Sequence, residues 1–133
     1  RHHRHSYYLI KNGDLRGFEP DEIECIALVA RCHRRGTPKR SHGEFASLSR
    51  ETRRVVRWLA AILRLAEGLD RSRAQLVQEV ALREHTDAWT LELMARGDIE
   101  LERWAAQRHA GPLEAELGRP IRLADPRHRK GRQ

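Results

Sequence analysis

The sequence predicts a mainly helical protein that ends in a small α+β unit. Apolar residues follow the helical period in three stretches of the first seventy residues, and the pattern then changes to strict alternation from Trp89 to Leu93. The 133 residues suffice for one ordinary core or two small subdomains. We therefore expect a helical domain over residues 1–73, an α+β domain over 74–125 and a disordered basic tail over 126–133.

The helical part divides into three expected helices. Residues 1–12 suit a helix that stops at Asn12-Gly13, and because its pattern starts without an N-cap signal we expect the domain to begin further upstream. A second helix opens at Pro20, with carboxylates in its first turn. Ser49 can cap a third helix that runs to about Glu67 and carries the richest apolar surface, so we expect it to be the central helix.

The second part has the pattern of a β-β-α-β unit. The alternating stretch that begins at Trp89 is expected to pair with Leu76 to Leu82 across a polar loop. Asp98 can cap a following helix, which Pro112 should kink or divide, and Ile121 to Leu123 suit a last short strand. The three tryptophans lie on the apolar stripes of their elements, which favours core packing over base stacking for Trp58, Trp89 and Trp104.

Composition limits the partners and the compartment. The formal net charge of +7 favours an acidic partner, which includes polyphosphate, nucleotides, nucleic acid and an anionic membrane surface. No apolar run approaches the roughly 20 residues that span a bilayer, so we expect a cytoplasmic protein without a membrane partner. Cys25 and Cys32 would lie about 10.5 Å apart along one helix, beyond the reach of a disulfide, and are expected to be free thiols.

Several segments together resemble one protein family. They are the histidine-rich start, Tyr7 to Pro20, Leu65 to Ser72 and Ala88 to Leu91. In this order they are similar to the C-terminal part of the exopolyphosphatase and guanosine pentaphosphate phosphatase (Ppx/GppA) family. The resemblance implies an HD-domain-like helical bundle with a small α+β appendix, preceded in the parent enzyme by an actin-like phosphatase module. It also implies that the catalytic residues and the magnesium belong to that module, so we expect neither a catalytic residue nor a cofactor in this chain.

The resemblance also implies a polar cluster in the helical domain. HD domains gather histidines and aspartates around divalent metals, which neutral imidazole and carboxylate bind well. The residues similar to late members of that pattern are His5, His33 and Asp70, with His3 beside them. Because the defining His-Asp doublet is absent, we expect a structural cluster of His3, His5, His33 and Asp70, with metal binding by His5, His33 and Asp70 as the alternative.

Basic residues gather in the stretch from His33 to His42. The candidate polyanion-binding residues are Arg34, Arg35, Lys39 and Arg40, with Arg4 beside the first histidines. Arginine suits phosphate because its planar fork binds two oxygens at once. A solvated basic loop without a ligand is the other interpretation of this stretch.

Two functions follow from these features. The first is a C-terminal domain that binds polyphosphate or guanosine pentaphosphate and supports dimerisation while the actin-like module cleaves phosphoanhydrides. The alternative is an autonomous HD-type metal-dependent phosphohydrolase that acts on a nucleotide, and an intact His-Asp doublet would favour it. We also expect a homodimer through the helical part, since Leu28, Val29, Trp58 and Ile62 carry more apolar surface than three helices can cover.

Overall fold

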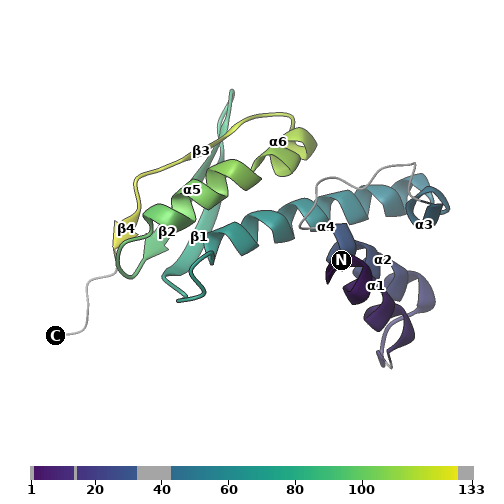
Figure 1. Ribbon diagram of the computed structural model, residues 1–133. Coiled ribbons are helices and arrows are strands. Elements are labelled where there is room, and N and C mark those ends of the chain that lie inside the picture. The colour runs from purple at the N-terminus through teal and green to yellow at the C-terminus, as the bar shows by residue number, and fades with distance from the viewer. Residues whose placement is uncertain (1, 14, 33–42, 129–133) are drawn as a thin grey trace. The chain divides into compact units, whose positions relative to one another are not determined.

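The computed structural model describes residues 2–13, 15–32 and 43–128 (Figure 1). The chain forms two compact units, Arg1–Arg64 and Leu65–Gln133, which we call the helical unit and the sheet unit. One long helix, α4 (Arg50–Leu69), contributes to both. The domain boundaries expected at residues 73 and 125 stay a prediction.

The helical unit opens with two antiparallel helices, α1 (His2–Asn12) and α2 (Pro20–Cys32), at the positions predicted from the sequence. The Tyr7 hydroxyl donates a hydrogen bond of 2.8 Å to Glu24, and Lys11 forms an ion pair with the same carboxylate. Two turns of α2 further on, the Arg31 guanidinium lies 5.6 Å from the centre of the Tyr7 ring. These contacts fix the register of the helix pair.

A short helix that the sequence did not predict, α3 (Gly43–Ala46), completes the core of this unit. Phe45 of α3 packs with Leu28 of α2 and Val56 of α4, and each of the three is at most 1% exposed. Leu28 is therefore a core residue, and the expectation that it would be left without a partner was wrong. Tyr7, Cys25, Val29 and Leu48 are partly buried around this cluster.

The central helix α4 begins where the sequence predicted. The Ser49 hydroxyl accepts a hydrogen bond of 3.2 Å from the Thr52 amide, which satisfies one of the free donors of the first turn. The helix ends two residues beyond the predicted Glu67, at Leu69. Of the described helices, none is long and apolar enough to cross a bilayer.

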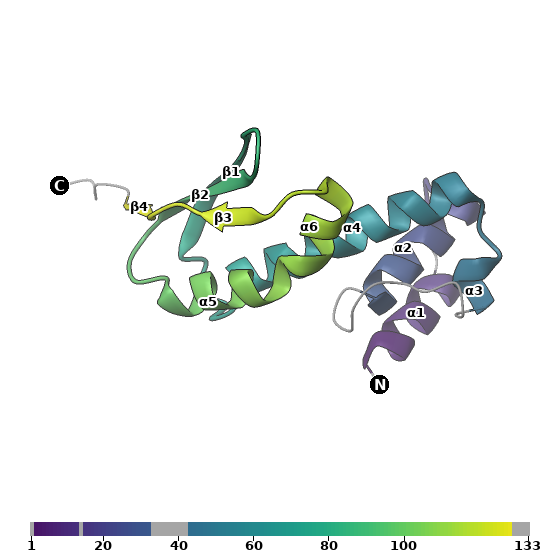
Figure 2. The ribbon, with the colours of Figure 1, turned by 90° about the horizontal axis from the view of Figure 1, so that it is seen from above.

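The sheet unit contains a mixed sheet. The antiparallel pair β1 (Val77–Glu84) and β2 (Trp89–Ala95) confirms the predicted hairpin. Two short strands, β3 (Ile121–Leu123) and β4 (Arg127–His128), run parallel to β2, and β1 forms one edge of the sheet (Figure 2).

One prediction needs a correction in this region. Arg127 and His128 were expected in a disordered tail, but they form β4 beside Met94 and Ala95 of β2. The edge of β2 beyond the short β3 is open to this pairing, and two residues are too few to show a strand pattern in the sequence. Residues 129–133 lie outside the described residues.

Two helices cover one face of the sheet, α5 (Glu100–His109) and α6 (Gly111–Leu117) (Figures 1 and 2). Pro112 lies in the first turn of α6 and divides the helical stretch, as predicted. The core between the layers contains Leu91, Leu93, Ala95, Ile99, Ala105, Ala106, Ala110, Leu113 and Ile121. The structure thus confirms helices followed by a small α+β unit.

The orientation of α5 corrects the prediction for Trp104, which is 52% exposed and not a core residue. A Cβ atom on Gly68 of α4 would lie only 3.2 Å from the carbonyl group of Ala105, so the two helices approach closely at small residues. Glu102 lies on the same buried face and accepts a hydrogen bond of 2.8 Å from the Ser72 amide. Because this face points inward, Trp104 points to solvent, where Arg108 lies 4.9 Å from its ring centre.

Candidate functional site

Most of the predicted polyanion-binding residues lie outside the described part of the chain. These are Arg34, Arg35, Lys39 and Arg40, and His33 of the polar cluster lies there too. His3, Arg4 and His5 belong to the first turns of α1, but their side chains also lie outside the described residues. The candidate site therefore stays a prediction, and the structure describes the elements that frame it.

The frame is one end of the α1–α2 pair. Because the helices are antiparallel and Tyr7 lies beside Arg31, the first turn of α1 is at the same end of the pair as Cys32. The basic segment 33–42 follows Cys32 directly, and the chain returns to the described structure at α3. Cys32 is buried, and so is Phe45 in α3, so described residues before and after the segment belong to the core of the helical unit.

Charge is distributed unevenly along this helix pair. Asp21 and Glu22 lie in the first turn of α2, and Arg31 lies in its last turn. The acidic side chains therefore mark the end of the pair that is remote from the basic segment. Arg31 marks the near end, where the first turn of α1 also adds the positive pole of its helix dipole. The C-terminal end of α2 lies there as well, and its negative pole opposes the dipole of α1, so an anion at the near end would depend on cationic side chains.

The thiol of Cys25, on the same helix, is not suited to nucleophilic chemistry. Burial raises its pKa, and the carboxylates of Asp21, Glu24 and Glu22 raise it further. The reactive thiolate is therefore disfavoured at neutral pH. Cys25 and Cys32 are both free cysteines, as the sequence predicted.

Asp70 is the one member of the predicted polar cluster whose side chain the structure describes. Its carboxylate accepts a hydrogen bond of 3.1 Å from the Gln75 amide and closes the turn that follows α4. This turn holds Arg73 and Gln75 at positive φ, a conformation that residues other than glycine rarely adopt. Asp70 therefore stabilises the turn that follows α4. Among the residues that the structure describes, no group of three His, Cys, Asp or Glu side chains could hold a metal ion.

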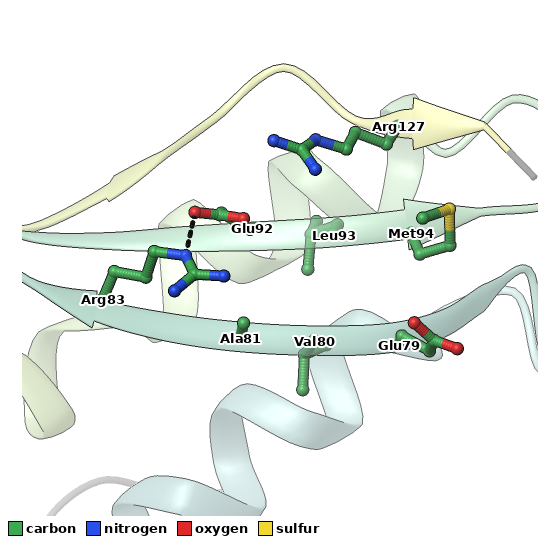
Figure 3. A pocket seen from close by; sticks show the side chains of 8 residues that line it. All are labelled: Glu79, Val80, Ala81, Arg83, Glu92, Leu93, Met94 and Arg127. Atoms are coloured by element: carbon green, nitrogen blue, oxygen red, sulfur yellow. Dashed lines mark hydrogen bonds and ion pairs between the residues drawn. The ribbon is translucent and has the colours of Figure 1, made fainter.

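The sequence did not predict a hollow of about 180 Å³, which lies on the open face of the sheet (Figure 3). Arg83 of β1 and Arg127 of β4 enter it from the two sides of β2, and Glu92 and Met94 line it between them. The Arg83 guanidinium pairs with Glu92 at 2.5 Å. The alternation of Glu79, Ala81 and Arg83 with Val80 and Leu82 is the signal that could have revealed this polar face.

The charges in this hollow largely neutralise one another. Two carboxylates, Glu79 and Glu92, lie among its two arginines, and both arginines are exposed to solvent. An anion would meet repulsion as well as attraction there, so the hollow is a weaker candidate for polyphosphate than the basic segment.

The comparison with known families confirms the resemblance seen in the sequence. The sequence model of Ppx/GppA phosphatase, domain III, matches residues 1–107. The match spans the helical unit, the β1–β2 hairpin and most of α5. It covers well over half of the chain, and we conclude that this protein belongs to the Ppx/GppA phosphatase family.

Proposed function

We propose that this chain is the C-terminal, polyanion-binding part of an exopolyphosphatase or guanosine pentaphosphate phosphohydrolase. Its helical unit would correspond to an HD-domain-like bundle that holds the substrate. The observation that carries the proposal is the match to domain III of the family over residues 1–107. Polyphosphate and guanosine pentaphosphate are both phosphoanhydride polyanions, so the charge of this chain suits either.

Electrostatics supports a role in holding the substrate. The chain carries a net charge of +7, and four cations fall within the eight residues that follow His33. In the sequence they follow Cys32, which lies at the end of the helix pair that carries Arg31 and is remote from Asp21 and Glu22. A polyphosphate chain carries about one charge per phosphate, so several cations in sequence can bind it at once and release its counterions. Arg4 would join them from the first turn of α1.

In this proposal the chemistry belongs to an actin-like module of the parent enzyme. That module would provide the phosphate loop, the catalytic base and the magnesium, and the present chain would provide binding only. Among the described residues, the Cys25 thiol has a raised pKa, and the Asp70 carboxylate accepts a hydrogen bond from the Gln75 amide. The partners we propose are therefore the actin-like module and the polyanion.

The proposal includes a homodimer, for which α4 offers an apolar surface. Val55, Leu59, Ile62 and Leu63 are each 40–48% exposed. Covering a side chain of this size contributes roughly 1.5 to 3 kcal/mol, so a partner that covers several of them would bind with useful affinity.

Polyphosphate binding tests the proposed function. The double variant Arg34→Ala/Lys39→Ala should bind long-chain polyphosphate several-fold more weakly than the wild-type chain. The matched control is Arg122→Ala/Arg127→Ala, which removes the same charge from exposed positions of the sheet unit and should change the affinity much less. Equal losses in the two variants would contradict a site in the helical unit and indicate diffuse attraction.

Phosphate release separates the two candidate functions. With magnesium or manganese present, the isolated chain should release no more phosphate from polyphosphate or from nucleotides than a blank without protein. Activity that copurifies with the chain and disappears in His33→Ala would contradict an accessory role and favour the HD-type phosphohydrolase.

A further inference from the structure

The edge strand β1 has eight residues and pairs, among the described strands, with β2 alone. An unpaired edge exposes backbone donors and acceptors, and proteins usually protect it with proline, a bulge or a covering segment. No proline occurs from Val77 to Glu84, and the register shift between Val77 and Glu79 affects only the start of the strand. Two apolar side chains of the strand, Val80 and Leu82, are 57% and 36% exposed.

The hairpin determines which backbone groups point outward. The His85 amide donates to the Ala88 carbonyl at 2.9 Å, so these two residues form a hydrogen-bonded pair. Such pairs alternate with non-hydrogen-bonded pairs along an antiparallel ladder. In the observed register, Ala81 and Arg83 therefore direct their amides toward β2. The amides and carbonyls of Val80 and Leu82 point to the free edge.

We propose that β1 pairs in antiparallel orientation with β1 of a second copy of this chain, about a two-fold axis at Ala81. In this register Val80 of each copy lies opposite Leu82 of the other, and both present outward backbone groups, as the ladder requires. On the open face Glu79 lies opposite Arg83 of the other copy, and the reverse pair forms across the axis. The sheets of the two copies would become one continuous sheet.

Charge complementarity selects this register. A two-fold axis at Glu79 or Arg83 would place like charges opposite each other, and an axis at Val80 or Leu82 would place neither charged residue opposite its complement. Arg83 already contacts Glu92 through its Nε atom, and the guanidinium has further donors for a second carboxylate. The result is a ladder of Glu92, Arg83 and the second copy's Glu79 across the joined sheets.

This inference goes beyond the proposed function and does not depend on polyanion binding. It also concerns a different surface from the exposed residues of α4. The two surfaces respond to different substitutions, because Glu79 and Arg83 lie on β1, whereas Ile62 lies on α4. A charge at Ile62 should leave the pairing of β1 intact.

Charge reversal in single variants and in their mixture tests the register. Glu79→Arg and Arg83→Glu each place like charges across the axis, and each should raise the dissociation constant of the dimer by more than about tenfold. Mixing the two variants restores both complementary pairs, so a heterodimer should form with nearly wild-type affinity. Sedimentation velocity over a dilution series measures all of these in an Ile62→Glu background, which disfavours association through α4 and leaves association through β1.

Amide hydrogen exchange of the wild-type chain gives an independent readout that needs no variant. The amides of Val80 and Leu82 should exchange slowly at high protein concentration and quickly on dilution. The amides of Ala81 and Arg83 donate hydrogen bonds to β2 in the monomer and in the dimer. Their exchange rates should therefore not depend on protein concentration. The proposal is overturned if the wild-type chain is monomeric throughout, if Val80 and Leu82 show no concentration dependence, or if the mixture fails to associate.

Discussion

The two units of this protein differ in how each closes its core. The sheet unit buries a continuous layer between its strands and helices, from Leu91 and Leu93 to Ala105 and Leu113. The core of the helical unit is centred on three fully buried side chains, Leu28, Phe45 and Val56. Large apolar residues remain exposed on its helices, with Tyr8 and Leu9 on α1 and Val55, Leu59, Ile62 and Leu63 on α4.

The difference shows two ways in which a domain can depend on a partner. The sheet unit buries a continuous apolar layer but leaves the backbone of β1 at a free edge, where Val80 and Leu82 are also exposed. The helical unit satisfies its backbone within helices but leaves apolar side chains uncovered. A covering partner would therefore stabilise the helical unit through side-chain burial, and an added strand would extend the sheet unit through hydrogen bonds.

The largest expected effect comes from removing the centre of the small helical core. Phe45→Ala should lower the free energy of unfolding of the helical unit by about 3–5 kcal/mol, because few neighbours can collapse into the cavity. Hydrogen exchange should accelerate for amides of α2 and for the first turns of α4, while β2 amides keep their protection. A loss below about 1 kcal/mol would show that Phe45 is not central to this core.

A second substitution probes the close packing of the sheet unit. Gly68→Leu should lower the free energy of unfolding by about 1–3 kcal/mol, because even a Cβ atom at this position would lie 3.2 Å from the Ala105 carbonyl group. Ala66→Leu is the matched control, because Ala66 is exposed on the same helix. Urea unfolding of both variants measures the difference, and equal stabilities would contradict a tight contact between α4 and α5.

A third substitution addresses the start of the helix that the units share. Ser49→Ala should lower the free energy of unfolding by about 1 kcal/mol, because the Thr52 amide loses its hydrogen-bond acceptor. Ser49→Asp supplies another good N-cap and should retain most of the stability. If both variants lose the same amount in urea unfolding, the hydroxyl does not act as a cap.

The smallest effect concerns the Cys25 thiol. Its raised pKa means that the folded state holds the proton more tightly than the unfolded state. This contribution to stability is complete below the ordinary thiol pKa and is lost as the pH rises through the higher folded pKa. The urea midpoint should therefore fall slightly more in this alkaline range for the wild-type chain than for Cys25→Ala. Parallel pH profiles would contradict the shift.

The main elements of both units could be predicted from the sequence because their signals are local. Pro20, Ser49 and Pro112 mark helix starts, and the alternation at Trp89 marks a strand. The exposure of Trp104 could not be predicted, because it depends on the approach of α5 to Gly68, a contact between distant residues. The short α3 and β4 were missed for a related reason, since their stability comes from Phe45 packing and from pairing with β2.

The candidate site was predicted from charge clustering and from the family resemblance. The comparison with known families confirms the family. The sequence predicted that Asp70 belongs to a polar cluster. The structure shows that the Asp70 carboxylate accepts a hydrogen bond from the Gln75 amide. That bond depends on the positive φ of Arg73 and Gln75, which no residue type in this stretch signals. The polyanion-binding residues stay a prediction.

The salt dependence of polyphosphate affinity tests the central claim, that the helical unit holds a polyanion through its basic segment. The logarithm of the binding constant should fall linearly with the logarithm of salt concentration, by analogy with single-stranded nucleic acids. Arg34→Ala/Lys39→Ala should reduce that slope by about 1.4, roughly 0.7 for each lost cation. A slope that is unchanged in this variant, or an affinity that does not respond to salt, would contradict the account.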